Sequence, residues 1–332
     1  MRVLVIGGTR FLGHELAWRL LAAGHEVTLF NRGTLADTFG SRVERLRGDR
    51  TTADFARLLA GREWDAAVDF AAYDGRDGRQ AAEVLGGRVG HYVVVSTGQV
   101  YLVRAGRPSP AREEDYDGPL MPEPSDPFDR GQWDYGMGKR ALEDALAEAW
   151  AKSRFPATRL RIPMVNGERD HFRRVERYLW RMLDGGPVLL PGGGGHRVRH
   201  VYSGSVVRLI LALLGDARTF GGAWNLAQDE TPTLREMLEL LALALGATPR
   251  LVDVPRDRVT AAGLDPLLLS PFSGTWMSFL DPSRAKAELG FAHEPLASYV
   301  GRIVASFLAH PPADAPPGLE RRADERALAA SG

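Results

Sequence analysis

The sequence predicts an α/β protein whose core is a doubly wound parallel sheet. Two observations support this fold class. Along the first half of the chain, short apolar runs alternate with segments whose apolar residues recur at helical spacing. A glycine-rich turn also joins the first apolar run to the first helical segment. Strands that alternate with helices form βαβ units, and right-handed crossovers then place the strands parallel in one sheet.

The individual elements follow from these patterns in chain order. The helical spacing that begins at Phe11 ends at Gly24, a residue type that commonly ends helices. The β-branched run Val93-Val94-Val95 marks a buried strand. Expected strands are 2–6, 26–30, 43–47, 66–71, 91–96 and 158–162. Expected helices are 11–23, 54–60, 135–152, 172–183, 206–214, 234–245 and 282–289.

The composition excludes several classes of protein. The 42 basic and 42 acidic residues balance, so the broad positive field of a general nucleic-acid binder is absent. Without cysteine there are no disulfides, thiolate metal sites or cysteine nucleophiles, and the eight histidines show no ligand-like spacing. No metal site is therefore expected. With neither a leader-like segment nor a long apolar run, we expect a cytoplasmic protein that does not enter the membrane.

The glycine-rich turn predicts a dinucleotide site. Its sequence is Gly7-Gly8-Thr9-Arg10-Phe11-Leu12-Gly13, and it lies between a strand and a helix. Gly7 permits the sharp turn, and Gly13 lets the helix and strand pack closely. The helix N-terminus then offers N–H groups and a positive dipole end to a pyrophosphate. An ordinary strand–helix turn that happens to use glycine is the alternative.

The end of the second expected strand bears on which nicotinamide dinucleotide is bound. A carboxylate there favours NAD, but the sequence reads Asn31-Arg32-Gly33. Arg32 and Arg10 are two cations suited to the additional phosphate of NADP, so NADP is preferred over NAD. Asp49, after the third strand, is either an acceptor for the adenine amino group or a plain turn residue.

The catalytic prediction depends on Tyr135 and Lys139, four residues apart on an expected helix. This spacing puts both side chains on one helix face. A nearby ammonium stabilises a phenolate and makes tyrosine a usable acid or base near neutral pH. A third group is expected at the end of the fifth strand, where the hydroxyl of Ser96 or Thr97 is suited to bond a substrate oxygen. A strand-capping role for these hydroxyls is the alternative.

Together these features resemble the extended short-chain dehydrogenase/reductase family, in its NAD-dependent epimerase/dehydratase branch. The resemblance covers roughly residues 1–300 and rests on the glycine turn, the Ser96–Tyr101 strand end, the Tyr135/Lys139 pair and the segments Arg161–Gly167 and Asp281–Ala285. It implies a Rossmann fold with seven strands in the order 3-2-1-4-5-6-7, and members are often dimers. It also implies that Thr97 is the catalytic hydroxyl, and that Ala71, Ala72 and Ile162 lie beside the nicotinamide.

The sequence departs from the family pattern at the glycine turn. Arg10 replaces the usual middle glycine, as in an atypical subgroup that includes chloroplast stem-loop RNA-binding proteins. A side chain therefore stands where backbone usually approaches the phosphate.

Further departures concern the substrate. Gly98 and Gln99 replace the Asp-Glu pair of dehydratases, so sugar dehydration is not expected, and Gln99 becomes a candidate substrate ligand. Met164 replaces a substrate-binding asparagine. The family's diphosphate-binding basic residue corresponds to either Arg197 or Arg199.

The expected organisation is a dinucleotide-binding domain at 1–165, a smaller helical substrate lobe at 166–310 with some return to the sheet, and a frayed tail at 311–332. The acidic, proline-rich stretch between Tyr101 and Tyr135 is either a flap over a site or a tolerated surface insertion.

The expected activity is NAD(P)-dependent oxidation and reduction or epimerisation at a secondary alcohol or ketone of a small molecule, such as a sugar or sugar nucleotide. One alternative is an NADPH-dependent reductase of a small non-sugar carbonyl. The other is a weakly catalytic RNA-binding relative, which the balanced charge disfavours.

Overall fold

The computed structural model describes residues 1–331 and divides into two compact units. Unit 1 contains residues 1–163, 203–227 and 278–292. Unit 2 contains residues 164–202, 228–277 and those from 293 onward. Residues 203–227 and 278–292 thus belong with the first half of the chain, where they supply a strand and two helices around its sheet.

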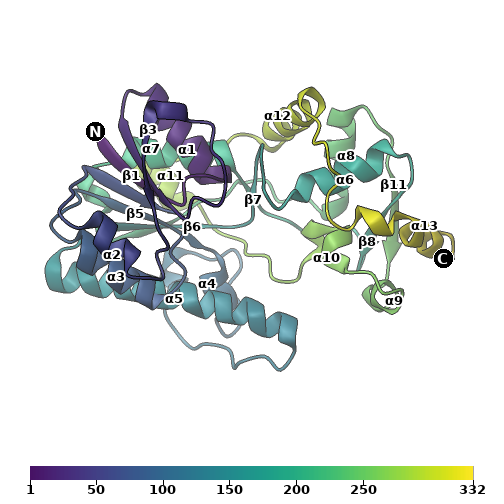
Figure 1. Cartoon of the computed structure of the whole chain (residues 1–332). Helices are drawn as coiled ribbons and strands as arrows, with labels where there is room; N and C mark the ends of the chain where they lie inside the picture. Colours follow the sequence, from purple (N-terminus) through teal and green to yellow (C-terminus); the bar gives the residue numbers. More distant parts are fainter. Residues whose placement is uncertain (332) are drawn as a thin grey trace. The chain divides into compact units, whose positions relative to one another are not determined.

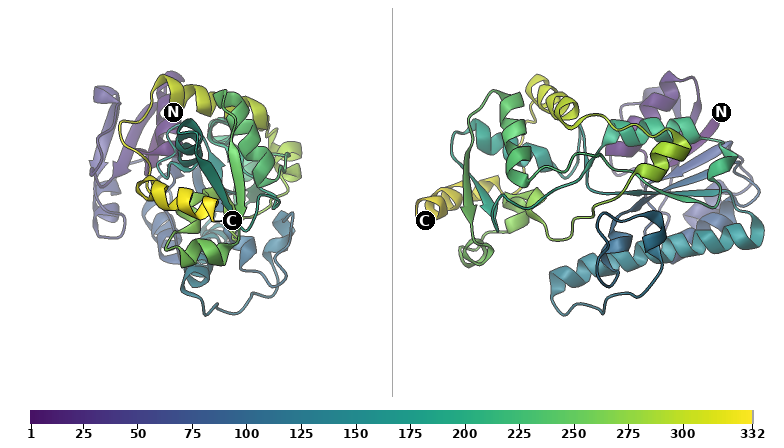
Figure 2. Two further views of the ribbon diagram at one scale, coloured as in Figure 1. Left: turned by 90° about the vertical axis from the view of Figure 1, so that its right-hand side faces the viewer. Right: turned by 180° about the vertical axis from the view of Figure 1, so that it is seen from behind.

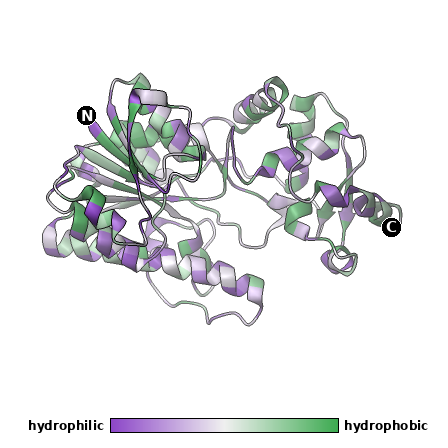
Figure 3. Cartoon of the chain, in the orientation of Figure 1, coloured by the Kyte–Doolittle hydropathy of each residue, from purple (hydrophilic) through white to green (hydrophobic). Residues whose placement is uncertain are grey.

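Seven parallel strands form the sheet of unit 1, in the order β3-β2-β1-β4-β5-β6-β10 (Figure 1). This order confirms the α/β Rossmann prediction. Figure 3 shows that these strands are largely hydrophobic, as expected for a sheet covered on both faces. The strands are β1 (Arg2–Ile6), β2 (Glu26–Asn31), β3 (Val43–Arg47), β4 (Ala66–Asp69), β5 (Tyr92–Thr97), β6 (Ala157–Ile162) and β10 (Ala223–Asn225).

Helices cover both faces of this sheet (Figures 1 and 2). The helix after the glycine turn, α1, packs with α7 on one face, and α3 packs with α5 on the other. The helices of unit 1 are α1 (Phe11–Ala22), α2 (Asp54–Leu59), α3 (Gly75–Leu85), α4 (Gln99–Leu102), α5 (Pro127–Ser153), α7 (Ser203–Leu213) and α11 (Ser283–Leu289).

Helix α3 was not predicted from the sequence, because its polar residues and two glycines hide the apolar stripe. Asp74 caps it by accepting hydrogen bonds from two backbone N–H groups of the first turn. The glycines serve the packing against α5. A Cβ at Gly75 would lie 3.0 Å from the Ala141 carbonyl oxygen, and one at Gly78 would lie 3.0 Å from that of Leu142.

Helix α5 begins at Pro127, eight residues before the predicted start. Asp126 caps it by accepting a hydrogen bond from the Asp129 N–H, and proline occupies the first helical position. The preceding part of the Tyr101–Tyr135 stretch is held to the core of unit 1. Ala111 pairs with Leu280, and the Tyr116 hydroxyl donates to Asp144 Oδ1 at 2.7 Å.

Unit 2 consists of helices and two short parallel strand pairs. The pairs are β7 (Val165–Asn166) with β9 (Val201–Tyr202), and β8 (Pro187–Pro191) with β11 (Arg250–Val254). The helices are α6 (Arg174–Leu183), α8 (Leu234–Leu245), α9 (Arg256–Ala261), α10 (Pro266–Leu269), α12 (Leu296–Ala309) and α13 (Arg322–Ala330). Across residues 1–331, no helix has both the length and the apolar character needed to cross a bilayer.

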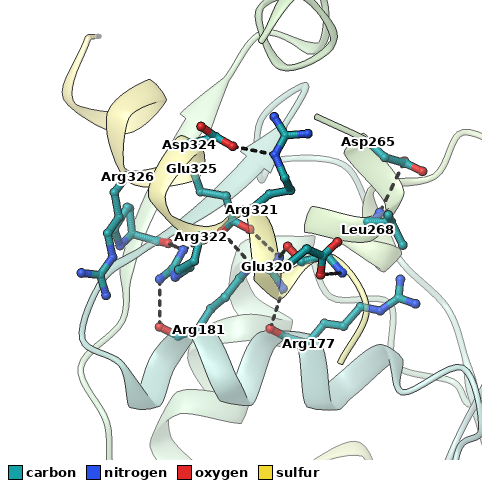
Figure 4. Close-up of polar contacts among 12 residues, drawn as sticks. Arg177, Arg181, Asp265, Leu268, Glu320, Arg321, Arg322, Asp324, Glu325 and Arg326 are labelled. Atoms are coloured by element: carbon teal, nitrogen blue, oxygen red, sulfur yellow. Dashed lines mark hydrogen bonds and ion pairs between the residues drawn. The ribbon is translucent and has the colours of Figure 1, made fainter. Parts of the chain in front are cut away.

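The C-terminal segment differs from the frayed tail that its composition suggests, because it contains α13. Figure 4 shows the polar contacts that hold this helix to α6. Arg181 donates from Nε and Nη2 to the two oxygens of Glu325, at 2.8 and 2.6 Å, and both side chains are fully buried. Arg322 adds a contact to Asp184 at 2.6 Å. The contacts with α6 explain why this segment is helical, because the segment alone lacks enough apolar surface to fold.

We expect Glu325→Gln to lower the free energy of unfolding of unit 2 by about 3 kcal/mol, because it leaves a buried guanidinium without its counter-charge. Asp324→Asn is the matched control. Asp324 is the preceding residue and pairs with Arg321, but these side chains are 50% and 45% exposed, so its loss costs at most about 1 kcal/mol. Urea unfolding of both variants tests the difference, and equal effects would contradict it.

Candidate active site

The glycine turn of unit 1 has the backbone geometry that the sequence predicts. Gly7 has a φ of +85°, a region that favours glycine. A Cβ at Gly13 would lie 2.6 Å from the Gly7 carbonyl oxygen, so only glycine lets α1 approach the turn this closely. At Gly7 and Gly13 the loop therefore has the close backbone approach of a phosphate-binding turn, while Arg10 adds a side chain to it.

The N-terminus of α1 is suited to an anion. Arg10 is the N-cap residue, and it is exposed, extended and makes no side-chain capping hydrogen bond. The first helical turn contains no acidic residue, so no carboxylate neutralises the positive end of the helix dipole. These features fit the pyrophosphate of a dinucleotide, with the Arg10 side chain as an additional cation.

A second group of cations lies at the end of β2. The Asn31 side chain accepts a hydrogen bond from the Gly33 N–H at 2.8 Å and forms the turn that presents the exposed Arg32. Arg47, which the sequence analysis missed, donates to the Gly33 carbonyl oxygen at 3.3 Å. The parallel register pairs Asn31 with Arg47, so the end of β3 lies beside the end of β2.

Of the two interpretations of Asp49, the contacts favour a turn residue. Its Oδ1 accepts from the N–H and the hydroxyl of Thr51, at 2.8 and 2.7 Å. The Thr51 hydrogen bonds lower the pKa of the Asp49 carboxyl, and the charge of Arg32 lowers it further.

Lys139 is fixed at the centre of the candidate catalytic group. Its side chain is buried, with 3% of the residue exposed, and its Nζ donates to the carbonyl oxygens of Ala72 and Val95 at 2.7 and 3.0 Å. An ammonium has three N–H bonds, so one donor remains. Tyr135 lies one turn earlier on α5 and is 39% exposed. The Tyr73 ring lies near both, 6.4 Å from the Tyr135 ring and 5.1 Å from Nζ.

Burial makes the Lys139 charge costly. Desolvation lowers the pKa of Lys139 from 10.5 to about 8, and the negative charges of Asp69 and Glu143 oppose that shift. The ammonium is therefore charged at neutral pH but close to losing its proton, which is the condition expected of a group that tunes an acid or base.

The two candidate hydroxyls at the end of β5 have different surroundings. Ser96 is buried and donates to Glu143 Oε1 at 2.5 Å, so it serves the core. Thr97 is partly exposed, and its Oγ1 accepts from the Gln99 N–H at 3.2 Å. The Gln99 side chain is buried and donates to Gln132 at 2.9 Å. Ile162 on β6 pairs with Thr97 on the neighbouring strand β5, so the carboxyl ends of these two strands lie side by side.

The remaining predicted substrate residues belong to unit 2. The Met164 carbonyl oxygen accepts from the Val201 N–H at 3.1 Å. Both candidate diphosphate-binding arginines contact one threonine. Arg197 donates to the Thr231 carbonyl oxygen, and Arg199 donates to its hydroxyl, each at 2.8 Å.

Sequence reasoning missed three residues that surround Lys139. Tyr73 follows the predicted pair Ala71-Ala72, and Arg50 follows Asp49. Their positions next to predicted site residues were the only sign in the sequence that they belong to the site. Asp77 lies in the unpredicted helix α3. Arg50 is buried and contacts the carboxylates of both Asp69 and Asp77.

Comparison with known proteins identifies a similar reductase and a similar stem-loop binding protein. The chain is 28% identical to the 2'-dehydrokanamycin reductase of Streptomyces kanamyceticus over 262 residues, which cover 77% of this chain and 70% of the reductase. It is 25% identical to the chloroplast stem-loop binding protein of 41 kDa b of Arabidopsis thaliana over 262 residues, 74% of this chain and 63% of that protein. The chain thus spans less than two thirds of the latter's length.

Solved structures share the fold. The UDP-glucose 4-epimerase of Thermotoga maritima, solved with UDP-glucose, matches with a TM-score of 0.72 and 20% identity, over 93% of this chain and 99% of that one. The dTDP-glucose 4,6-dehydratase of Bacillus anthracis, solved with NAD, matches with a TM-score of 0.73 and 17% identity, over 94% and 97%. The sequence profile of the NAD dependent epimerase/dehydratase family matches residues 3–227, and the chain belongs to this family of enzymes.

Proposed function

We propose that this protein transfers a hydride between a nicotinamide dinucleotide and the carbon of a secondary alcohol or ketone. Tyr135 gives or takes the proton of the substrate oxygen, and Thr97 donates a hydrogen bond to that oxygen. Lys139 stabilises the phenolate form of Tyr135. The observation that carries this proposal is the buried Lys139 ammonium, held by two carbonyl oxygens one helical turn from a tyrosine.

The residues present fit the cofactor. The glycine cradle and the acid-free N-terminus of α1 suit its pyrophosphate, while Ala71, Ala72 and Ile162 provide an apolar edge at the carboxyl ends of β4 and β6. A bound nicotinamide supplies or accepts the hydride. The chain's own residues position the substrate oxygen and move one proton at the Tyr135 hydroxyl.

NADP is the proposed form of the cofactor. Arg10, Arg32 and Arg47 are exposed cations at the ends of β1, β2 and β3, and no acidic residue ends β2. Guanidinium groups bind phosphate with charge-assisted hydrogen bonds, whereas a carboxylate at this point suits an unmodified ribose.

We expect Arg32→Asp to weaken NADPH binding by about tenfold to a hundredfold and to leave NADH binding within about threefold, because one charge-assisted contact is lost and a repulsive charge is gained. Arg19→Asp, at the far end of α1, is a control for the change of charge. Titration of protein with each cofactor by nicotinamide fluorescence measures the ratio, and an unaltered ratio would refute the phosphate contact.

For the substrate, we propose a ketone on a sugar ring that carries no nucleotide. Met164 lacks the polar group of the family's asparagine, and the Thr231 contacts occupy part of each candidate diphosphate-binding arginine. The similarity to 2'-dehydrokanamycin reductase also supports a keto-sugar substrate. NADPH oxidation should be measured with nucleotide-free keto sugars, with 4-keto nucleotide sugars and with non-sugar ketones. Preference for either of the latter two would overturn this assignment.

A role in RNA binding is the second candidate, because the similarity to a chloroplast stem-loop binding protein favours it. The retained Thr97, Tyr135 and Lys139 and the balanced charge favour catalysis instead. Binding of a stem-loop RNA to the pure protein that weakens as salt is raised, but persists at physiological ionic strength, would support the RNA role.

A further inference from the structure

Two buried carboxylates hold the loop that follows β4. The Ala71 N–H donates to Asp69 Oδ1, and the Tyr73 N–H donates to Asp77 Oδ2, each at 2.7 Å. Asp69 ends β4 and is fully buried, while Asp77 lies in the first turn of α3. These contacts fix the backbone on both sides of Ala72.

The residue between them, Ala72, is held by Lys139. The Ala72 carbonyl oxygen accepts from Lys139 Nζ at 2.7 Å. Three consecutive loop residues are thus each bonded, through a backbone group, to a charged side chain from a different position in the fold. The Ala72 carbonyl oxygen, together with that of Val95, thus sets where the Lys139 ammonium lies.

Arg50 joins the two carboxylates. Its Nη1 donates to Asp69 Oδ2 at 2.5 Å, its Nε lies 3.2 Å from Asp77 Oδ1, and its Nη2 donates to the Asp77 carbonyl oxygen at 3.2 Å. The side chain is 7% exposed. Asp69 Oδ2 also accepts from the Tyr92 hydroxyl at 2.7 Å, so both oxygens of this carboxylate accept hydrogen bonds.

Two carboxylates, Asp69 and Asp77, lie with two cations, Arg50 and Lys139, so these four charges balance and tolerate burial. Without Arg50, Lys139 would be the remaining counter-charge for two buried carboxylates, at a cost of several kcal/mol. The charged groups that act on Lys139 come from β4, α3, α5 and the segment after β3; they are Asp69, Asp77, Glu143 and Arg50. The aromatic rings beside it are Tyr73 and Tyr135.

We propose that Arg50 is a positioning residue for the proposed reaction: by bridging Asp69 and Asp77 it fixes the Ala71–Tyr73 loop and sets the place and charge of Lys139. This inference rests on the proposed function for its link to catalysis. Its structural and electrostatic part concerns the chain alone, and a measurement without cofactor or substrate tests that part.

The lysine content of the chain makes such a measurement direct. The sequence contains three lysines, Lys139, Lys152 and Lys286. Protein labelled with ¹³C at lysine Cε therefore gives three NMR signals, and the signal that is missing in Lys139→Met belongs to Lys139. Its titration midpoint in the wild-type protein is expected at about 8.

The variants should move this midpoint in opposite directions. Asp69→Asn removes a charge that raises the pKa of Lys139, so the midpoint falls by about one pH unit. Arg50→Met removes a charge that lowers the pKa, so the midpoint rises, by less than the fall in Asp69→Asn. Arg50→Lys keeps the charge and should restore the wild-type midpoint. Midpoints that stay unchanged in both charge-removing variants would overturn the proposal.

Cofactor binding tests the positional part. We expect Arg50→Met to weaken NADPH binding about tenfold and Arg50→Lys to recover most of that loss. Arg45→Met is the matched control, because Arg45 is an ion-paired arginine on β3, bonded to Asp37, away from the loop. If Arg50→Met does not fold, the Lys139 midpoint and the NADPH affinity are measured in Asp69→Asn, which also breaks the bridge, and in Arg50→Lys, which keeps its charge.

The results also separate this inference from the proposed function. A wild-type protein that reduces no ketone, with lysine midpoints that shift as expected, would sink the proposed function and leave the electrostatic role of Arg50 standing. Normal turnover and NADPH binding in Arg50→Met would sink the positioning role alone.

Discussion

Tyr135→Phe is expected to reduce turnover by about a thousandfold while NADPH affinity stays within about threefold, because only the proton-moving hydroxyl is lost. The ring remains, and its contact with the Tyr73 ring is kept. Stopped-flow or steady-state NADPH oxidation measures turnover, and fluorescence titration measures affinity.

Tyr73→Phe is the control for this experiment. Tyr73 is an exposed tyrosine beside the same ammonium, and loss of its hydroxyl should change turnover by less than about threefold. A large loss in Tyr73→Phe with normal turnover in Tyr135→Phe would show that the catalytic role belongs to the other tyrosine.

Lys139→Met is expected to lower turnover by about a hundredfold or more, because the phenolate loses its nearby cation. It should also change how stability depends on pH. The folded protein releases the Lys139 proton near pH 8, whereas the unfolded chain keeps it to about 10.5. Between these values the unfolded state binds more protons, so the stability of the wild type relative to the variant rises with pH.

Between about pH 8 and 10.5, the free energy of unfolding of the wild type relative to Lys139→Met rises by about 3 kcal/mol, and this gain is lost again as the pH falls to about 8. Urea unfolding of both proteins from neutral to alkaline pH measures it, and the other titrating groups cancel in the difference. A difference that does not depend on pH would mean that the ammonium is not desolvated in the folded protein.

Local sequence patterns predicted the central strands and the Tyr135/Lys139 pair well. The β-branched run 93–95 forms a buried strand in most tertiary settings, and residues four apart on a helix share a face wherever that helix packs. The helix that carries the pair still began eight residues earlier than predicted, because Gly131 masks the helix propensity of the residues before Tyr135. A Cβ at Gly136 would lie 2.6 Å from Val103 Cγ1, so the packing explains the glycine.

Other elements left no local signal. The seventh strand, β10, has three residues, too few for a recognisable alternation. The end of the chain has the composition of a frayed tail, and distant contacts such as the buried pairing of Arg181 with Glu325, separated by 144 residues, hold it as a helix. Arg47 lies beside the Arg32 turn because of the parallel register of β2 and β3, which no short motif records.

By itself the sequence determined the fold class, the glycine turn before α1 and the placing of Tyr135 and Lys139 one turn apart on a helix, because each depends on residues within one or two helical turns. The tertiary structure decided which groups surround that lysine. Asp69 and Arg50 are 19 residues apart, and they meet because the connection that leaves β3 at the edge of the sheet returns past β2 and β1 to β4 and carries Arg50 to the end of that strand. Electrostatic environments depend on distances in space, and separation along the chain does not fix those distances.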